Sequence, residues 1–199
     1  MIEKNIACHF SSFFIICLGA CNKEIQLTNT VSEAKLTDRE KFLLSSTSDK
    51  SFVFDYKADK KYKQVSLWVD KYEFGKLVEE KLNNMLTEID GTGTIIFSTS
   101  PTIAEQKEST INISVNNNNG FSTIRTQLIK PKAMKSTWGS NPSEHIPIAD
   151  KMVLASICYS NGQGMSSLTN DFYSDIDNRL HEIKDYDDVY VLRAEFLDK

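Results

Sequence analysis

The sequence predicts a mainly β protein, an antiparallel two-layer β-sandwich of about eight strands with one C-terminal helix before the last strand. Three observations predict this fold. From residue 51 onward, β-branched and aromatic residues recur in segments that alternate apolar and polar positions. Short turn-forming segments separate several of these segments. One later segment instead carries apolar residues at helical spacing.

In chain order, the expected strands are 51–58, 63–73, 76–82, 92–100, 109–115, 120–129, 152–160 and 188–196. Within 63–73, one face carries Val65, Leu67 and Val69, and the other carries Ser66, Trp68, Asp70 and Tyr72. Gly75 stands where a hairpin would reverse the chain into 76–82. Four asparagines and Gly120 form a similar turn signal before 120–129.

Short connections of this kind favour antiparallel pairing, because parallel strands need crossovers of about a dozen residues or more. The alternation also predicts that each sheet has one face in the core and one face in water. We expect a helix within 168–186, where Leu168, Phe172 and Ile176 follow at intervals of four, and we expect it to cover an edge or end of the sandwich. Proline and glycine in 136–150 predict a long loop.

The first 20 residues have the pattern of an export signal. Lys4 gives a weak positive start, and an apolar run follows that is too short for the roughly 20 residues of a membrane-spanning helix. The run ends in Leu18, Gly19, Ala20 and Cys21, which resembles the lipobox of bacterial lipoproteins. The resemblance implies cleavage before Cys21 and attachment of a diacylglyceryl group to its sulfur.

This resemblance divides the chain into a lipoprotein signal peptide at 1–20, a lipidated flexible tether at 21–48 and an extracytoplasmic β-sandwich domain at 49–199. Within the tether, Thr37 is a possible N-cap of a short helix. The expected location is the extracytoplasmic side of the cell membrane, with membrane lipid as a partner through the acylated cysteine. Two acyl chains anchor a protein stably, whereas one binds only marginally.

Two segments of the expected domain, "SLWVDKYEFGKLV" at 66–78 and "YDDVYVLRAEF" at 186–196, are similar to segments of surface lipoproteins from Gram-positive, Bacillus-type bacteria. The similarity lies in strands and carries no chemical motif. It implies a lipoprotein and transfers no catalytic residue.

The charge and cysteine content restrict the partners. The net charge is −4, and no basic block is present, so nucleic acid is not an expected partner. Cys8 and Cys17 leave with the signal peptide and Cys21 is lipidated in this interpretation. Cys158 then has no cysteine to pair with. Its apolar neighbours predict that it is a small buried residue.

No motif in the sequence predicts a metal site or a cofactor. His145 and His181 lack the spacing of zinc ligands. Asp171, Asp175 and Asp177 are weak candidates for calcium, because their segment lacks the glycine and the distal glutamate of a calcium-binding loop. A solvated acidic face at the start of a helix is the favoured interpretation.

The sequence also lacks the motifs of nucleophilic and phosphate chemistry. No G-x-S-x-G elbow and no phosphate-binding GK[ST] loop occur. The paired carboxylates Glu79 and Glu80 point to opposite faces of an expected strand, which is the wrong geometry for acid–base catalysis. We therefore expect a protein that is not an enzyme.

Aromatic residues are the remaining candidates for recognition. Trp68 and Tyr72 share the polar face of 63–73, and Trp138 lies in the expected loop. Exposed aromatic rings beside polar groups bind sugars and peptides. The alternative interpretation is that Trp68 fills a second packed face and that Trp138 holds its loop in place.

The expected function is therefore a membrane-anchored binding module of the cell envelope, with an envelope polymer, a peptide or a membrane protein as its partner. Two alternatives stay open. One is a self-protection lipoprotein that intercepts an antimicrobial peptide. The other is an envelope hydrolase whose active site is assembled from residues far apart in the sequence.

Overall fold

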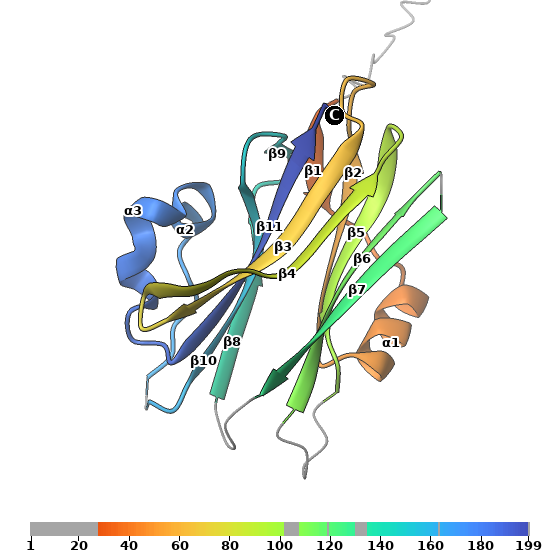
Figure 1. The fold of residues 1–199 in the computed structure, drawn as a ribbon. Helices are drawn as coiled ribbons and strands as arrows, with labels where there is room; N and C mark the ends of the chain where they lie inside the picture. Colours follow the sequence, from red (N-terminus) through yellow and green to blue (C-terminus); the bar gives the residue numbers. More distant parts are fainter. Residues whose placement is uncertain (1–27, 102–107, 119, 130–134, 163, 199) are drawn as a thin grey trace, which may run out of the picture.

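Two antiparallel sheets form the framework of the computed structural model, which describes residues 28–101, 108–118, 120–129, 135–162 and 164–198 (Figure 1). The six-stranded sheet has the order β7 (Gly120–Ile129), β6 (Glu108–Asn117), β5 (Thr92–Thr99), β2 (Lys50–Lys57), β1 (Thr30–Glu33) and β9 (Ile146–Pro147). The five-stranded sheet has the order β4 (Lys76–Glu88), β3 (Gln64–Glu73), β11 (Asp188–Leu197), β10 (Met152–Ser160) and β8 (Lys135–Ser140). Every strand pair is antiparallel. The predicted mainly β, two-sheet fold is confirmed.

The main core lies between the two sheets. Alternate residues of β2, namely Phe52, Phe54 and Tyr56, face Leu67 and its neighbours on β3. Val65, Leu67 and Val69 enter this core from one face of β3, as the alternation predicts. The other face of β3 was expected to be in water, but it is buried as well. Large apolar side chains of this kind stabilise a fold by about 1.5–3 kcal/mol each when they are fully buried.

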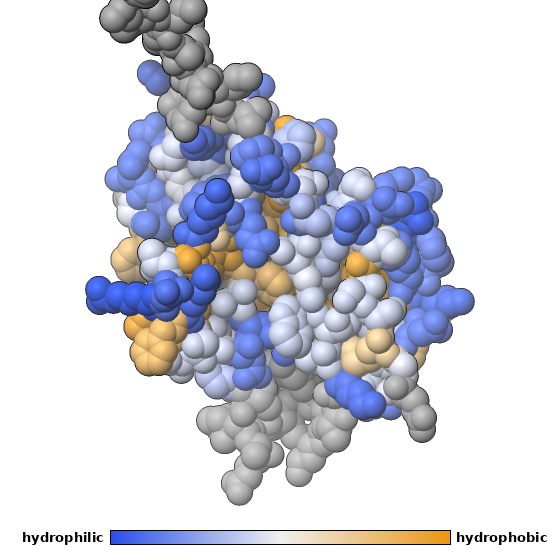
Figure 2. Space-filling model, turned by 180° about the vertical axis from the view of Figure 1, so that it is seen from behind, coloured by the Kyte–Doolittle hydropathy of each residue, from blue (hydrophilic) through white to orange (hydrophobic). Residues whose placement is uncertain are grey.

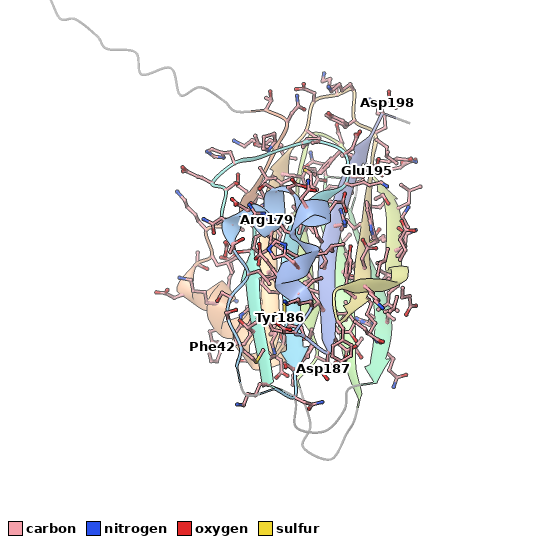
Figure 3. All side chains as sticks on the ribbon, turned by 90° about the vertical axis from the view of Figure 1, so that its left-hand side faces the viewer. Phe42, Arg179, Tyr186, Asp187, Glu195 and Asp198 are labelled. Atoms are coloured by element: carbon pink, nitrogen blue, oxygen red, sulfur yellow. The ribbon has the colours of Figure 1, made fainter. Side chains whose placement is uncertain are left out.

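A helical segment covers the outer face of the five-stranded sheet. It consists of α2 (Asn170–Ser174), α3 (Ile176–Arg179) and a 3₁₀ turn, η1 (Leu180–Ile183), and it packs on β10 and β11. Figure 3 looks onto this segment, with Arg179 on its outer side. Phe172, Ile176 and Ile183 are buried there, so a second apolar cluster forms outside the sandwich. The segment therefore lies over a sheet face and not at an edge or end.

The single helix expected within 168–186 is broken at Asp175. This residue has φ −149° and ψ 67°, which no α-helix accommodates. Its carboxylate accepts a hydrogen bond from the side chain of Asn178, 2.8 Å away. Short polar side chains stabilise non-helical backbone through such local bonds. The predicted helix before the last strand is therefore present as short helices and not as one continuous helix.

The folded domain begins earlier than residue 49. The strand β1 pairs with both β2 and β9, and α1 (Asp38–Thr47) follows it, so most of the expected tether is structured. The helix has the predicted N-cap, because Thr37 and Glu40 form reciprocal hydrogen bonds. The part of the tether at 21–27 lies outside the described residues.

Two further strands, β8 and β9, lie within the expected loop at 136–150 or overlap it, so that prediction is wrong in part. With β1 they raise the number of strands among the described residues to eleven, against about eight expected. Both are edge elements, and edge strands need little of the apolar alternation that marks a buried strand. The predicted hairpin at Gly75 is confirmed, with φ +76° at that residue.

Candidate functional site

A buried ion pair lies on the outer face of the five-stranded sheet. The carboxylate of Asp70 on β3 lies 2.9 Å from Nε of Arg193 on β11. Both side chains are at most one-tenth exposed. The pairing of Trp68 with Arg193 and of Asp70 with Val191 places both charges on the same face of adjacent strands. Asp70 also accepts a hydrogen bond from the backbone N–H of Lys81, at 3.0 Å.

Beside this pair is a cleft of about 470 Å³, which we call the Arg193 cleft. One wall is the segment from β9 to the start of β10, and the other is the end of α2 with the start of α3. Buried apolar side chains of the cleft include Ile146, Met152, Val153 and Ile176. Its volume falls within the usual range of ligand sites, about 300–1,000 Å³.

The rim of the Arg193 cleft is mostly acidic. The exposed residues Asp150, Asp175 and Asp177 line it, together with Lys151. The charge of Arg193 is compensated by Asp70. The three rim carboxylates thus outnumber the single uncompensated cation, Lys151.

Arg193 connects one wall of the cleft to the neighbouring strand β3. Its Nη1 donates to the carbonyl of Lys151 at 3.1 Å, which fixes the turn before β10. Its Nη2 lies 3.4 Å from the hydroxyl of Tyr72 on β3. Lys151 has φ +52°, a left-handed conformation that a non-glycine residue adopts at some cost. The guanidinium bond therefore stabilises a strained turn at the mouth of the cleft.

Neighbouring tyrosines are also buried. Burial raises the pKa of Tyr72, and the hydrogen bond from Arg193 partly offsets this increase. The hydroxyl of Tyr173, which lines the cleft, lies 3.0 Å from the hydroxyl of Ser156 on β10. Both tyrosines are therefore neutral at physiological pH and act as hydrogen-bonding groups.

The expected aromatic recognition residues lie apart from one another. Trp68 is 1% exposed and Tyr72 is 3% exposed, so neither presents an open ring to a ligand. The ring of Trp68 is covered by the side chain of Lys81, whose Nζ lies 5.1 Å from the ring centre. Trp68 therefore fills a second packed face of the sheet, which was the alternative interpretation of the sequence.

Trp138 is 54% exposed, and it lies on the edge strand β8 and not in a loop. The ammonium group of Lys50 lies 4.8 Å from its ring centre and 5.8 Å from that of Tyr159. Burial in this position lowers the pKa of Lys50. Trp138 and Trp68 therefore do not border one groove, because β11 and β10 separate their strands.

A second exposed apolar surface lies on α1, where Phe42 and Leu43 are each more than half exposed. Figure 2 shows hydrophobic surface on and beside this helix. The helix is on the opposite side of the molecule from α2 and α3 (Figure 1). It contributes nothing to the Arg193 cleft.

Cys158 is buried, as predicted, and packs among Phe172, Val189 and their neighbours. Burial raises the pKa of its thiol to about 12. A thiol of this kind is protonated and unreactive at neutral pH.

The three aspartates that were calcium candidates do not share one site. Asp171 forms an ion pair with Arg179 at 2.5 Å, whereas Asp175 and Asp177 line the Arg193 cleft. Across the parts of the chain that the structure describes, no three His, Cys, Asp or Glu side chains are grouped as a metal site would require. His145 and His181 are exposed.

The lipobox residues Leu18, Gly19, Ala20 and Cys21 lie outside the described residues. Among the described residues, no helix has the length and apolar character that crossing a membrane requires.

Sequence reasoning missed Arg193, Asp150 and the cleft itself. One signal was present, because Arg193 interrupts the apolar run of the last strand between Leu192 and Ala194. A lone charge in such a run indicates a buried ion pair or a functional group. The cleft itself joins residues that lie more than 40 positions apart, such as Lys151 and Arg193, and no local pattern predicts it.

Fold and site together define an antiparallel two-sheet domain with one helix-covered face and a ligand-sized cleft beside a buried ion pair. The chain belongs to the YgaN domain family, whose model matches residues 30–196. The match begins at the first strand and ends in the last, so it covers the whole folded domain, β1 and α1 included. No curated protein and no solved structure matches the chain.

Proposed function

We propose that this protein is a lipid-anchored binding module on the extracytoplasmic side of a bacterial membrane, and that it binds its ligand in the Arg193 cleft. The observation that carries the binding role is the cleft itself, with Arg193 more than nine-tenths buried in it and charged groups at its rim. Pockets that combine apolar walls with a few convergent polar groups are the usual form of a binding site.

The anchoring role rests on the lipobox resemblance at Cys21. The first strand starts at Thr30, nine residues later. A chain of nine residues spans at most about 30 Å, so the domain would stay close to the membrane surface. Tethering of this kind raises the effective concentration of the domain near other membrane components.

Two experiments test the two parts separately. For the anchor, mass spectrometry of the protein from its native host is expected to find an N-terminal peptide that begins at a lipid-modified Cys21. A Cys21→Ser variant is expected to leave the membrane fraction. An uncut chain with an unmodified thiol at residue 21 would contradict the anchor.

For the cleft, we suggest NMR titration of the mature chain, residues 21–199 with Cys21→Ser, with soluble fractions of the host envelope. Backbone signals of Val153, Ile176 and Arg193 are expected to shift. A Ser174→Trp variant places a large ring at the cleft wall and is expected to abolish these shifts. Ser46→Trp on the exposed face of α1 is the matched control, because it adds the same ring away from the cleft. Shifts that persist in the Ser174→Trp variant would exclude the cleft as the binding site.

Interception of an antimicrobial peptide is the second candidate function, and one observation favours it. The acidic rim of Asp150, Asp175 and Asp177 is suited to a peptide with positive charge. Deletion of the gene is then expected to increase the sensitivity of the host to such a peptide. Unchanged sensitivity would leave the general binding role and remove this one.

A further inference from the structure

We infer that the ligand of the Arg193 cleft is a peptide segment with a basic side chain, bound with a backbone oxygen toward Arg193 and its positive charge at the acidic rim. This inference rests on the proposed binding role of the cleft and names the chemistry of its ligand. Three features carry it: unused donors on a buried arginine, the sign of the rim charge and the apolar side chains that line the same cleft.

The first feature is the incomplete hydrogen bonding of Arg193. A guanidinium group has five N–H donors. The carbonyl of Lys151 accepts one hydrogen bond from Nη1, and the hydroxyl of Tyr72 accepts one from Nη2. Nε lies 2.9 Å from the carboxylate of Asp70 as an ion pair, but its N–H makes no hydrogen bond to the part of the chain that the structure describes. One hydrogen on Nη1 and one on Nη2 have no partner among the described residues. Because Arg193 is only 8% exposed and lines the cleft, an acceptor oxygen of a bound ligand would satisfy them.

The second feature is the sign of the charge that a ligand meets. The charge of Arg193 is balanced by Asp70, so it does not make the cleft basic. Three carboxylates and one ammonium group remain at the rim. A fully anionic ligand would be repelled there, whereas a neutral carbonyl oxygen accepts a hydrogen bond from the guanidinium without that repulsion. A cationic group next to the carbonyl is attracted by Asp150 and Asp177.

The third feature is the apolar wall. Ile146, Met152 and Ile176 are buried and line the same cleft as the guanidinium and the exposed carboxylates. Lysine and arginine side chains place their methylene stems on apolar surface while the charged end stays in water. A peptide backbone with one such side chain can use all three kinds of group that line the cleft: the guanidinium donors, the apolar side chains and the carboxylates.

The test uses three model peptides that differ at one position: acetyl-Leu-Lys-Leu-amide and the same peptide with Gln or Glu in place of Lys. Each is titrated into the mature chain, residues 21–199 with Cys21→Ser, and the Nε–H signal of Arg193 and the backbone signals of the cleft are followed by NMR. The lysine peptide is expected to shift these signals and to bind more weakly as salt is added. The glutamate peptide is expected not to bind.

Two double variants separate the rim charge from the net charge of the protein. Asp150→Asn with Asp177→Asn removes two rim carboxylates and is expected to weaken binding of the lysine peptide about tenfold. Asp38→Asn with Asp185→Asn changes the net charge equally at exposed positions that do not line the cleft, and is expected to leave the affinity unchanged.

Each other outcome overturns the inference in a recognisable way. Equal or tighter binding of the glutamine or glutamate peptide in the cleft would overturn the charge preference and leave the binding role intact. Failure of the lysine peptide to shift any cleft signal would overturn the ligand class. The proposed binding role would be excluded only if the envelope fractions also left the cleft signals unchanged in the mature chain without Ser174→Trp.

Discussion

Asp70 and Arg193 lie on adjacent strands, and Oδ2 of Asp70 is 2.9 Å from Nε of Arg193. Both lie on the sheet face that the helical segment covers. Replacement of Asp70 by Asn leaves an uncompensated charge in this buried position. We expect the free energy of unfolding to fall by about 3–5 kcal/mol, because a buried ion pair that loses one partner is strongly destabilised. Urea denaturation followed by circular dichroism measures this.

The control for this prediction is Glu73→Gln. Glu73 pairs with Lys71 at 2.5 Å, but its side chain is 44% exposed. Exposed pairs contribute at most about 1 kcal/mol, so the loss is expected to stay below that value. Similar losses in the two variants would contradict the importance assigned to burial of the Asp70–Arg193 pair.

The two tryptophans are expected to differ strongly in their effect on stability. Trp68→Ala removes a fully buried ring and is expected to cost about 3–5 kcal/mol. Trp138→Ala removes a half-exposed ring and one cation–π contact with Lys50, and is expected to cost below about 1.5 kcal/mol. Denaturant unfolding of both variants measures the difference. The comparison requires that the unfolding free energy falls with denaturant concentration at the same slope in both variants. A cost for Trp138→Ala as large as that for Trp68→Ala would be inconsistent with its exposure.

Gly75 and Gly91 provide a matched pair for the hairpin turn. Both have positive φ, +76° and +68°, so an alanine at either position is strained by about 1–2 kcal/mol. A Cβ at Gly75 would also lie 3.1 Å from the carbonyl oxygen of Leu180 and 3.2 Å from Cα of Lys184. At Gly91 nothing lies within 4 Å. We expect Gly75→Ala to lower the melting temperature more than Gly91→Ala, and the reverse order would exclude close packing of the hairpin against η1.

Stability is expected to decrease at alkaline pH. Burial raises the pKa of Cys158 from 9.0 to about 12 and that of Tyr190 from 10.0 to about 12, and it raises the pKa of Tyr159 as well. Below about pH 9 these groups are protonated in both the folded and the unfolded chain. Above it the unfolded chain releases protons that the folded chain retains, so unfolding becomes more favourable up to about pH 12.

Denaturant unfolding at several values between pH 8 and pH 11 measures this decrease. In the Cys158→Ala variant, the decrease in unfolding free energy that begins near pH 9 is expected to be absent. The decrease that comes from the buried tyrosines is expected to remain. A free energy of unfolding that stays constant up to pH 11 would contradict the burial of these groups. The same thiol is expected to react with a thiol-specific reagent only after unfolding.

The long strands of both sheets were predictable from their β-branched and aromatic residues. Alternation was the weaker signal in the five-stranded sheet, because β3, β10 and β11 are buried on both faces. On β3, Val65 and Leu67 enter the core, whereas Trp68 and Asp70 lie on the other face, as the pattern predicts. The face that carries Asp70 was expected to be wet. It is instead covered by the helical segment, and a pattern within one strand contains no information about a partner more than 90 residues away.

Two short strands and the cleft escaped prediction for related reasons. The strand β9 has two residues and β1 has four, too few for a periodic pattern. The Arg193 cleft depends on the left-handed turn at Lys151 and on the helix break at Asp175. Both are decided by tertiary hydrogen bonds or local side-chain bonds, and propensity does not resolve such choices.

The position of β1 also has a mechanical consequence. The strand lies between β2 and β9, and Val31 pairs with both Tyr56 and Ile146. Tension applied along β1 from its N-terminal side would load its cross-strand hydrogen bonds together, in shear, because they run perpendicular to the strand. Ile146 also lines the Arg193 cleft. A pull on the N-terminal chain would therefore be transmitted directly to one wall of that cleft.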